Sequence, residues 1–154
     1  MIEQAKNISL FLLIGLILTA VTNWLESDFI VDFLSSNLIT LLIALIAINT
    51  TTLSVVLTKI REISDRLGGD FSNTAREMKL SLVEQVILVV VTTITQVMKE
   101  SVLVASAFPS IGFISSVIMI GVFAYAIHIL YDTANSIFVI LNFENTLSQN
   151  RGEE

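Results

Sequence analysis

Long apolar runs without charge alternate along the chain with short charged segments. The runs cover residues 7–25, 33–58 and 111–131, and a further apolar stretch covers residues 80–105. Each is long enough to cross the hydrocarbon core of a bilayer, which takes roughly 20 helical residues. The pattern therefore predicts an all-α integral membrane protein with four transmembrane helices arranged as two hairpins.

The third run is the one that contains charged residues. Lys99 and Glu100 lie near its end, where a lysine stem can reach the interface with water. Pro109, the only proline, predicts a turn before the fourth helix. Trp24 at the end of the first run is typical of an interfacial anchor. No small-residue cleavage pattern follows it, so we expect a retained helix rather than a signal peptide.

The composition agrees with a lipid environment. Hydrophobic residues make up 54% of the 154 residues and charged residues only 14%, against roughly 25% in soluble domains. Mean hydropathy is +0.83. A soluble domain of this size needs charge to cover its surface. We therefore expect one domain over 1–154, multipass in the inner (plasma) membrane and surrounded by membrane lipids.

Lysine and arginine are distributed unevenly about the predicted helices. One side of the membrane would carry seven of them, and the other side only Lys99. Cytoplasmic segments are rich in these residues, so both termini are predicted to lie in the cytoplasm. The seven are Lys6, Lys59, Arg61, Arg66, Arg76, Lys79 and Arg151.

The second and fourth helices are predicted to continue beyond the membrane on the cytoplasmic side. The glycine pair at 68–69 is a stop signal, and Thr74 with Glu77 matches a capping box. These signals predict a cytoplasmic helical hairpin over 59–79. A second cytoplasmic helix is predicted over 133–147, where helix-forming residues follow the last apolar run.

The basic residues of this hairpin have two interpretations. They either meet lipid phosphates, as cytoplasmic charges commonly do, or form a docking surface for a cytoplasmic protein partner. They are Lys59, Arg61, Arg66, Arg76 and Lys79.

Polar side chains in the third helix recur on one face, opposite a face of Val and Ile. Lipid offers no hydrogen bonds, so each of these side chains needs a partner. One interpretation is bonding to neighbouring helices, at about 0.6 kcal/mol each. The other is a wetted face that lines a pore or cavity at an oligomer axis. The four residues are Gln85, Thr92, Gln96 and Lys99.

In the second helix, Asn49 precedes three consecutive threonines. Threonine can bond to the carbonyl of its own helix four residues earlier. Asn49 does this less easily, so it is the residue expected to bond across helices. Small residues four apart, at Gly15 and Thr19 and at Gly112 and Ser116, predict close helix contacts.

The fourth helix carries a second polar set near its cytoplasmic end. It contains the only histidine, His128, one turn before Asp132, and a neighbouring carboxylate favours the charged form of a histidine. The set therefore either senses protons or forms a structural network at the interface, with Arg61 or Lys79 as a partner. Its members are Tyr125, His128, Asp132 and Asn135.

Several classes of function have no signature in the sequence. There is no Gly-rich phosphate loop and no His-Glu metal motif. One histidine and no cysteine leave no set of ligands for a metal. We therefore expect no catalytic residue, no metal and no cofactor, and the protein is not expected to be an enzyme. No segment is basic enough to make nucleic acid an expected partner.

The layout resembles that of small four-helix inner-membrane proteins of phage exclusion and abortive infection. The shared features are a short multipass chain, a basic linker after the second span, here Lys59-Ile60-Arg61-Glu62, and a helical C-terminus. The resemblance implies a role in phage defence. It covers the layout and no specific motif, so it assigns no functional residue.

Together these features predict a homo-oligomeric membrane protein that conducts ions or perturbs the membrane under the control of a cytoplasmic partner. One protomer is too small to enclose an ion path, so conduction would require an oligomer. The alternative is a non-conducting membrane anchor or sensor that docks a soluble partner through the 59–79 hairpin. A small transporter is a third possibility, although transporters usually have more helices and paired repeats.

Overall fold

The computed structural model describes residues 2–67 and 72–151, with side chains over 6–65 and 73–138, and apart from short turns these residues are helical. The helices are α1 (Ile2–Trp24), α2 (Phe29–Leu67), α3 (Ser72–Glu100), α4 (Val102–Ala107) and α5 (Ile111–Arg151). All except the short α4 are long and apolar enough to cross a membrane. The four spans predicted from the apolar runs are therefore present as four long helices.

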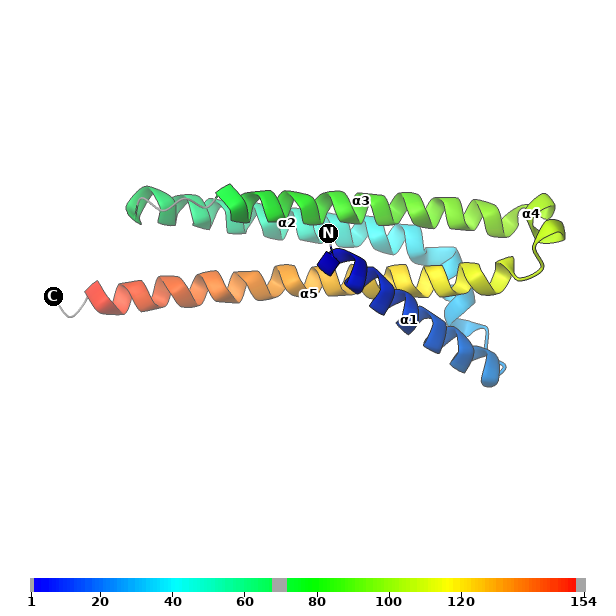
Figure 1. The fold of residues 1–154 in the computed structure, drawn as a ribbon. Helices are drawn as coiled ribbons and strands as arrows, with labels where there is room; N and C mark the ends of the chain where they lie inside the picture. Colours follow the sequence, from blue (N-terminus) through cyan, green and yellow to red (C-terminus); the bar gives the residue numbers. More distant parts are fainter. Residues whose placement is uncertain (1, 68–71, 152–154) are drawn as a thin grey trace.

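Three of the long helices form a bundle and the fourth lies across it. In Figure 1, α2, α3 and α5 run side by side, and α1 crosses α5 obliquely. α2 packs against both α3 and α5, whereas α1 packs mainly against α5. The first and second spans, expected to form one hairpin, therefore have few contacts with each other.

Two glycines explain why α1 packs on α5. A Cβ at Gly15 would collide with the carbonyl oxygen of Val117 and would lie 3.0 Å from the backbone nitrogen of Gly121. A Cβ at Gly121 would lie 3.0 Å from the carbonyl oxygen of Phe11. The two backbones can approach this closely only because neither residue has a side chain. Gly112, also expected at a close contact, has no atom within 4 Å of its Cβ position.

The cytoplasmic extensions predicted for the second and fourth helices are helical in the structure. α2 continues past residue 58 to Leu67, and α5 runs without a break through the region 133–147. A cluster of buried side chains joins the three helices in this part of the bundle. It contains Leu53, Val56 and Ile60 of α2 and Met78 of α3, with Leu82 and Ile137 packed against them.

Two helix boundaries differ from those predicted. The third span, expected to continue to residue 105, ends at Glu100, because Ser101 has an extended backbone and caps α4 by accepting a hydrogen bond from the Val104 amide. Thr74 lies inside α3, which already begins at Ser72, so it is not the N-cap of that helix. The predicted stop at 68–69 lies outside the described residues.

The outward faces of the bundle are apolar. On α3, Val86, Val90, Ile94 and Val97 are each more than half exposed. α1 also exposes a row of leucines and isoleucines between residues 8 and 18. Such faces are stable against lipid tails, which leaves helix packing to close contacts and polar bonds between helices.

Candidate functional site: a polar interior in the helical bundle

The polar face of α3 points into its own protomer. Gln85 and Thr92 are 2% and 0% exposed, and the Val and Ile residues of the opposite face are exposed instead. α3 packs on α2 and α5, so these two helices cover the polar face. The residues expected on one face therefore do share it, and within the single chain that face is turned inward.

Gln96 and Lys99 bond to α2 near the end of the bundle where α2 begins. The Gln96 side-chain amide donates to the carbonyl oxygen of Ser35 at 2.8 Å. The Lys99 ammonium donates to the hydroxyl oxygen of the same Ser35 at 3.0 Å. At these two positions the structure agrees with the interpretation of bonds between neighbouring helices.

This contact also sets the register of the antiparallel helices α2 and α3. Asn49 lies 14 residues after Ser35, and Gln85 lies 14 residues before Lys99. With equal rise per residue along both helices, Asn49 and Gln85 lie at the same level of the bundle. The Asn49 side chain is 0% exposed, so it is fully enclosed by the helices, as Gln85 is on α3.

Four buried side chains in this interior have polar atoms without a hydrogen-bond partner among the described residues. Both side-chain polar atoms of Asn49 and of Gln85 are in this state, as are the hydroxyl oxygens of Thr92 and Ser115. They come from all three helices of the bundle, α2, α3 and α5. In lipid, where no water competes, an unpaired buried polar group costs several kcal/mol.

The other hydroxyl side chains near Asn49 behave differently. Thr50, Thr51 and Ser54 each donate to the carbonyl oxygen four residues earlier in α2, at 2.8–3.0 Å. In the threonine run, the hydroxyls of Thr50 and Thr51 are therefore satisfied within their own helix. Asn49 stands apart as the residue of that run whose polar group is buried between helices.

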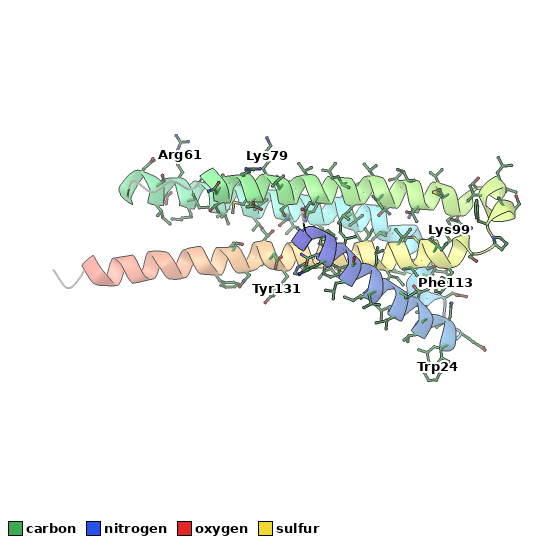
Figure 2. The ribbon with its side chains drawn as sticks, in the orientation of Figure 1. Trp24, Arg61, Lys79, Lys99, Phe113 and Tyr131 are labelled. Carbon is green, nitrogen blue, oxygen red and sulfur yellow. The ribbon has the colours of Figure 1, made fainter. Side chains whose placement is uncertain are left out.

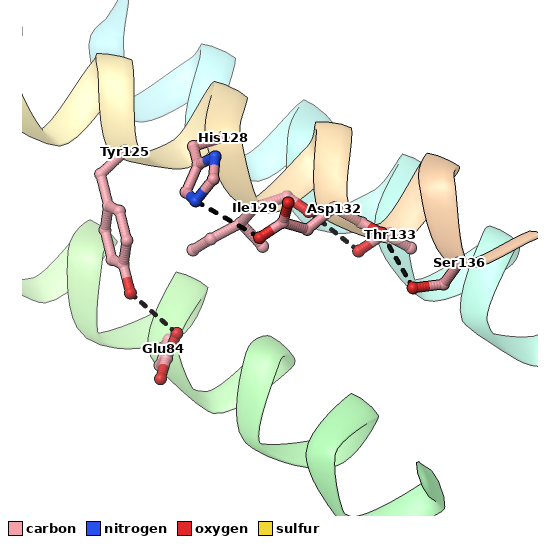
Figure 3. A network of polar contacts seen from close by, with 7 residues as sticks. All are labelled: Glu84, Tyr125, His128, Ile129, Asp132, Thr133 and Ser136. Atoms are coloured by element: carbon pink, nitrogen blue, oxygen red, sulfur yellow. Dashed lines mark hydrogen bonds and ion pairs between the residues drawn. The ribbon is translucent and has the colours of Figure 1, made fainter. Parts of the chain in front are cut away.

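The second polar set surrounds Tyr125 and His128 (Figure 3). The Tyr125 hydroxyl donates to a carboxylate oxygen of Glu84 on α3 at 3.0 Å. One turn further along α5, Nε2 of His128 lies 3.3 Å from a carboxylate oxygen of Asp132. Asn135, expected in the same set, is exposed and makes no hydrogen bond with a described residue.

Glu84 is the member of this site that the sequence analysis did not predict, because it lies at the edge of the third uncharged run. It precedes Gln85, so the register places it level with the segment of α2 around Asn49. That segment lies nine residues before the uncharged run of α2 ends at Thr58. The position of Glu84, four residues inside the expected span 80–105, was the sequence signal that could have indicated it.

α1 covers this polar set from outside the bundle. The Phe11 ring lies 5.1 Å from the Tyr125 ring and 5.1 Å from the His128 ring, measured between centroids. The Tyr125 and His128 rings are 6.5 Å apart. The glycine contact between α1 and α5, one turn away at Gly15, holds Phe11 in this position.

Among the described side chains, the basic residues of the 59–79 segment do not join this site. Lys59 pairs with Glu62 on its own helix at 2.9 Å. Arg61 and Lys79, suggested as partners of His128 and Asp132, point away from α5 (Figure 2). Arg76 is exposed as well, and the side chain of Arg66 lies outside the described residues.

Among the described residues there is no group of three or more His, Cys, Asp or Glu side chains that could hold a metal ion. The chain matches no protein-family model, no curated protein sequence and no solved structure. The arrangement of the polar interior is therefore the basis for a functional proposal.

Proposed function

We propose that this protein conducts ions across a membrane along the polar interior of the α2–α3–α5 bundle. The observation that supports the proposal is the set of four fully buried side chains with unpaired polar atoms: Asn49, Gln85, Thr92 and Ser115. Valine or leucine at these positions would avoid the cost of unpaired polar atoms in lipid. Polar groups retained inside a membrane bundle commonly mark an ion or proton path.

The path differs in place from the one that the sequence suggested. An oligomer axis would need the polar face of α3 to be exposed, whereas Gln85 and Thr92 are enclosed within one chain. The side chains along it are fully buried, so the proposed path suits protons or small ions passed between polar groups. Assembly into a homo-oligomer through the exposed apolar faces of α1 and α3 is a separate part of the proposal.

Flux into liposomes that contain the purified protein tests this proposal. Proton uptake driven by a potassium diffusion potential should exceed that of empty liposomes. Gln85→Leu should lower it to the empty-liposome level, because the substitution removes the carboxamide at the middle of the path. Val86→Leu, on the exposed face next to it, should leave the flux unchanged.

Two results would reject conduction through the interior. One is a wild-type flux equal to that of empty liposomes. The other is a Gln85→Leu variant that conducts like the wild type while it elutes and melts like a folded protein. Asn49→Leu, at the same level on α2, repeats the test from the other helix.

A second candidate function, a membrane anchor for a soluble partner, is favoured by the extension of the bundle. The cluster around Leu53, Ile60 and Met78 makes this extension a packed three-helix unit. Arg61 and Lys79 point outward from it (Figure 2) and would suit an acidic protein surface. A role in phage defence, which the layout resemblance implies, is part of this proposal and fits either function. Charge reversal at Arg61 and Lys79 should then abolish phage exclusion in cells without changing flux in liposomes.

A further inference from the structure

A carboxylate, Glu84, lies at membrane depth in this bundle, and the His128–Asp132 pair lies on α5 nearer the proposed cytoplasmic end. Glu84 is half-buried, accepts a hydrogen bond from Tyr125 and is level with the uncharged middle of α2. An ionisable residue in a membrane span is rare because its charged form is costly in lipid. Carboxylates in this situation serve repeatedly as proton carriers in membrane proteins.

Polar atoms without partners surround the same level of the bundle. The carboxamides of Asn49 and Gln85 are 0% and 2% exposed and have no hydrogen-bond partner among the described residues. Each carboxamide carries both a donor and an acceptor. Each can therefore serve as donor to a carboxylate or as acceptor from a carboxylic acid that reaches this level of the bundle.

The titratable and charged groups around Glu84 differ from helix to helix. α5 contributes Tyr125, His128 and Asp132, on successive turns toward the C-terminus. α3 itself carries Lys79, which points away from α5 (Figure 2). α2 has no charged residue between Asp32 and Lys59, and its residues at this level are Asn49 and the threonines. On α1, the charged residue nearest Phe11 is Lys6.

These groups form a graded series from exposed to enclosed. The Asp132 and His128 side chains are 62% and 36% exposed, whereas Tyr125 is partly buried between Phe11 and Glu84. An imidazole can bind and release a proton, and Nε2 of His128 lies 3.3 Å from the Asp132 carboxylate. The pair is therefore placed to take up protons from water at the cytoplasmic end, one turn away from Tyr125.

We infer that Glu84 is a proton-binding site at membrane depth, loaded from the cytoplasmic side through the His128–Asp132 pair. One proton passes from water to the His128 imidazole, and Asp132 stabilises the resulting positive charge. The proton then passes to the Glu84 carboxylate, which becomes a carboxylic acid while His128 returns to its neutral form. Tyr125 is a positioning residue that holds the Glu84 carboxylate toward α5. No other bond forms or breaks.

This inference rests on the proposed conduction only for its last step. A protonated Glu84 is a hydrogen-bond donor at the level of Asn49 and Gln85, so it can deliver the proton to the polar interior. The ion conducted along that interior would then be the proton. Proton binding at Glu84 can be measured whether or not the protein conducts.

Infrared difference spectroscopy of the protein in lipid tests proton binding directly. Lowering the pH should produce the carbonyl band of a protonated carboxylic acid, and Glu84→Gln should remove one component of that band. Glu77→Gln, an exposed glutamate of α3 two turns earlier, should leave that component in place. Tyr125→Phe should keep the component but move its frequency, because the Glu84 carboxyl group loses a hydrogen-bonded neighbour.

The same variants measured in liposomes separate this inference from the proposed function. Glu84→Gln and His128→Gln should both lower proton flux, with Glu77→Gln at the wild-type level. If the infrared spectrum contains the Glu84 component but neither the wild type nor any variant shows proton flux, conduction is rejected and the proton-binding site is retained. An infrared band unchanged by Glu84→Gln, or wild-type flux in that variant, would overturn the inference. If Glu84→Gln does not fold, an unmoved band in Tyr125→Phe would overturn it instead.

Discussion

At the scale of single residues, buried polar side chains of one chemical type do not all behave alike in this bundle, because the hydroxyls of Thr92 and Ser115 have no partner among the described residues. Hydroxyl groups such as those of Thr95 and Thr133 donate to a carbonyl oxygen of their own helix. Among the carboxamides, Asn37 donates to the carbonyl oxygen of Phe33 on its own helix, Gln96 bonds across to α2, and Asn49 has no partner among the described residues. The sequence predicted the bonds of threonines within their own helix, whereas the bond expected from Asn49 to a neighbouring helix is absent among the described residues.

What the sequence could not supply is the register between helices. The polar face of α3 was visible from its spacing, but whether that face met a neighbouring helix or an oligomer axis depends on how α2 and α5 cover it. Glu84 was missed for the same reason. Its position inside the apolar stretch was visible in the sequence, but its level against α2 follows from the contact of Ser35 with Lys99.

Gln96→Leu tests the bond between α3 and α2. The substitution removes the donor to the Ser35 carbonyl oxygen, and side-chain hydrogen bonds in membrane bundles contribute about 0.6 kcal/mol on average and at most about 1.7 kcal/mol. We expect the free energy of unfolding to fall by an amount in this range. Thr93→Val is the control, because Thr93 is exposed and bonds to Val89 of its own helix. Equal stabilities for the two variants in detergent unfolding would contradict a role for Gln96 between helices.

At the scale of elements, the position of α1 is the feature that depends most on tertiary packing. The apolar run predicted α1 as a span, and Gly15 was recognised as part of a small-residue pattern. The pattern did not indicate the partner helix, and the same pattern at Gly112 lies where nothing approaches it. The end of α3 at Glu100 was likewise hidden, because the apolar composition continues through α4 and only the extended backbone of Ser101 interrupts it.

A pair of glycine variants tests the packing of α1 on α5. In Gly15→Ala the new methyl group would collide with the backbone carbonyl of Val117, so α1 would have to move away. Overpacking of this kind typically costs about 1–3 kcal/mol. In Gly112→Ala the methyl group meets nothing within 4 Å, and the change should stabilise the helix by up to about 1 kcal/mol. In equilibrium unfolding, the free energy of unfolding should therefore fall in Gly15→Ala and rise in Gly112→Ala. A change in the same direction in both variants would contradict the close contact.

At the scale of the whole molecule, the lengths of the helices distinguish the part that would span the membrane from the part that would extend beyond it. α1 has 23 residues, whereas α2 has 39 and α5 has 41. At about 1.5 Å per residue, α1 is roughly as long as a bilayer core is thick and the other two are much longer. Figure 1 shows that α2, α3 and α5 all extend past the N-terminal end of α1, on the side where the chain ends. Arg61, Arg76 and Lys79 belong to that extension, which is the distribution expected of a cytoplasmic end.

Orientation can be tested because the chain has no cysteine of its own. Asn73 and Ser106 are both exposed and lie at opposite ends of α3 and its continuation into α4. We expect Ser106→Cys to react with a membrane-impermeant maleimide in intact cells, because that end carries only Lys99 among the basic residues. Asn73→Cys should react only after the membrane is permeabilised, because it lies beside the basic extension. Reversed labelling would place the His128–Asp132 pair on the outer side, so that protons would reach Glu84 from outside. Labelling of both cysteines in intact cells would mean that α3 does not cross the membrane. The polar interior could then not be a path across the membrane.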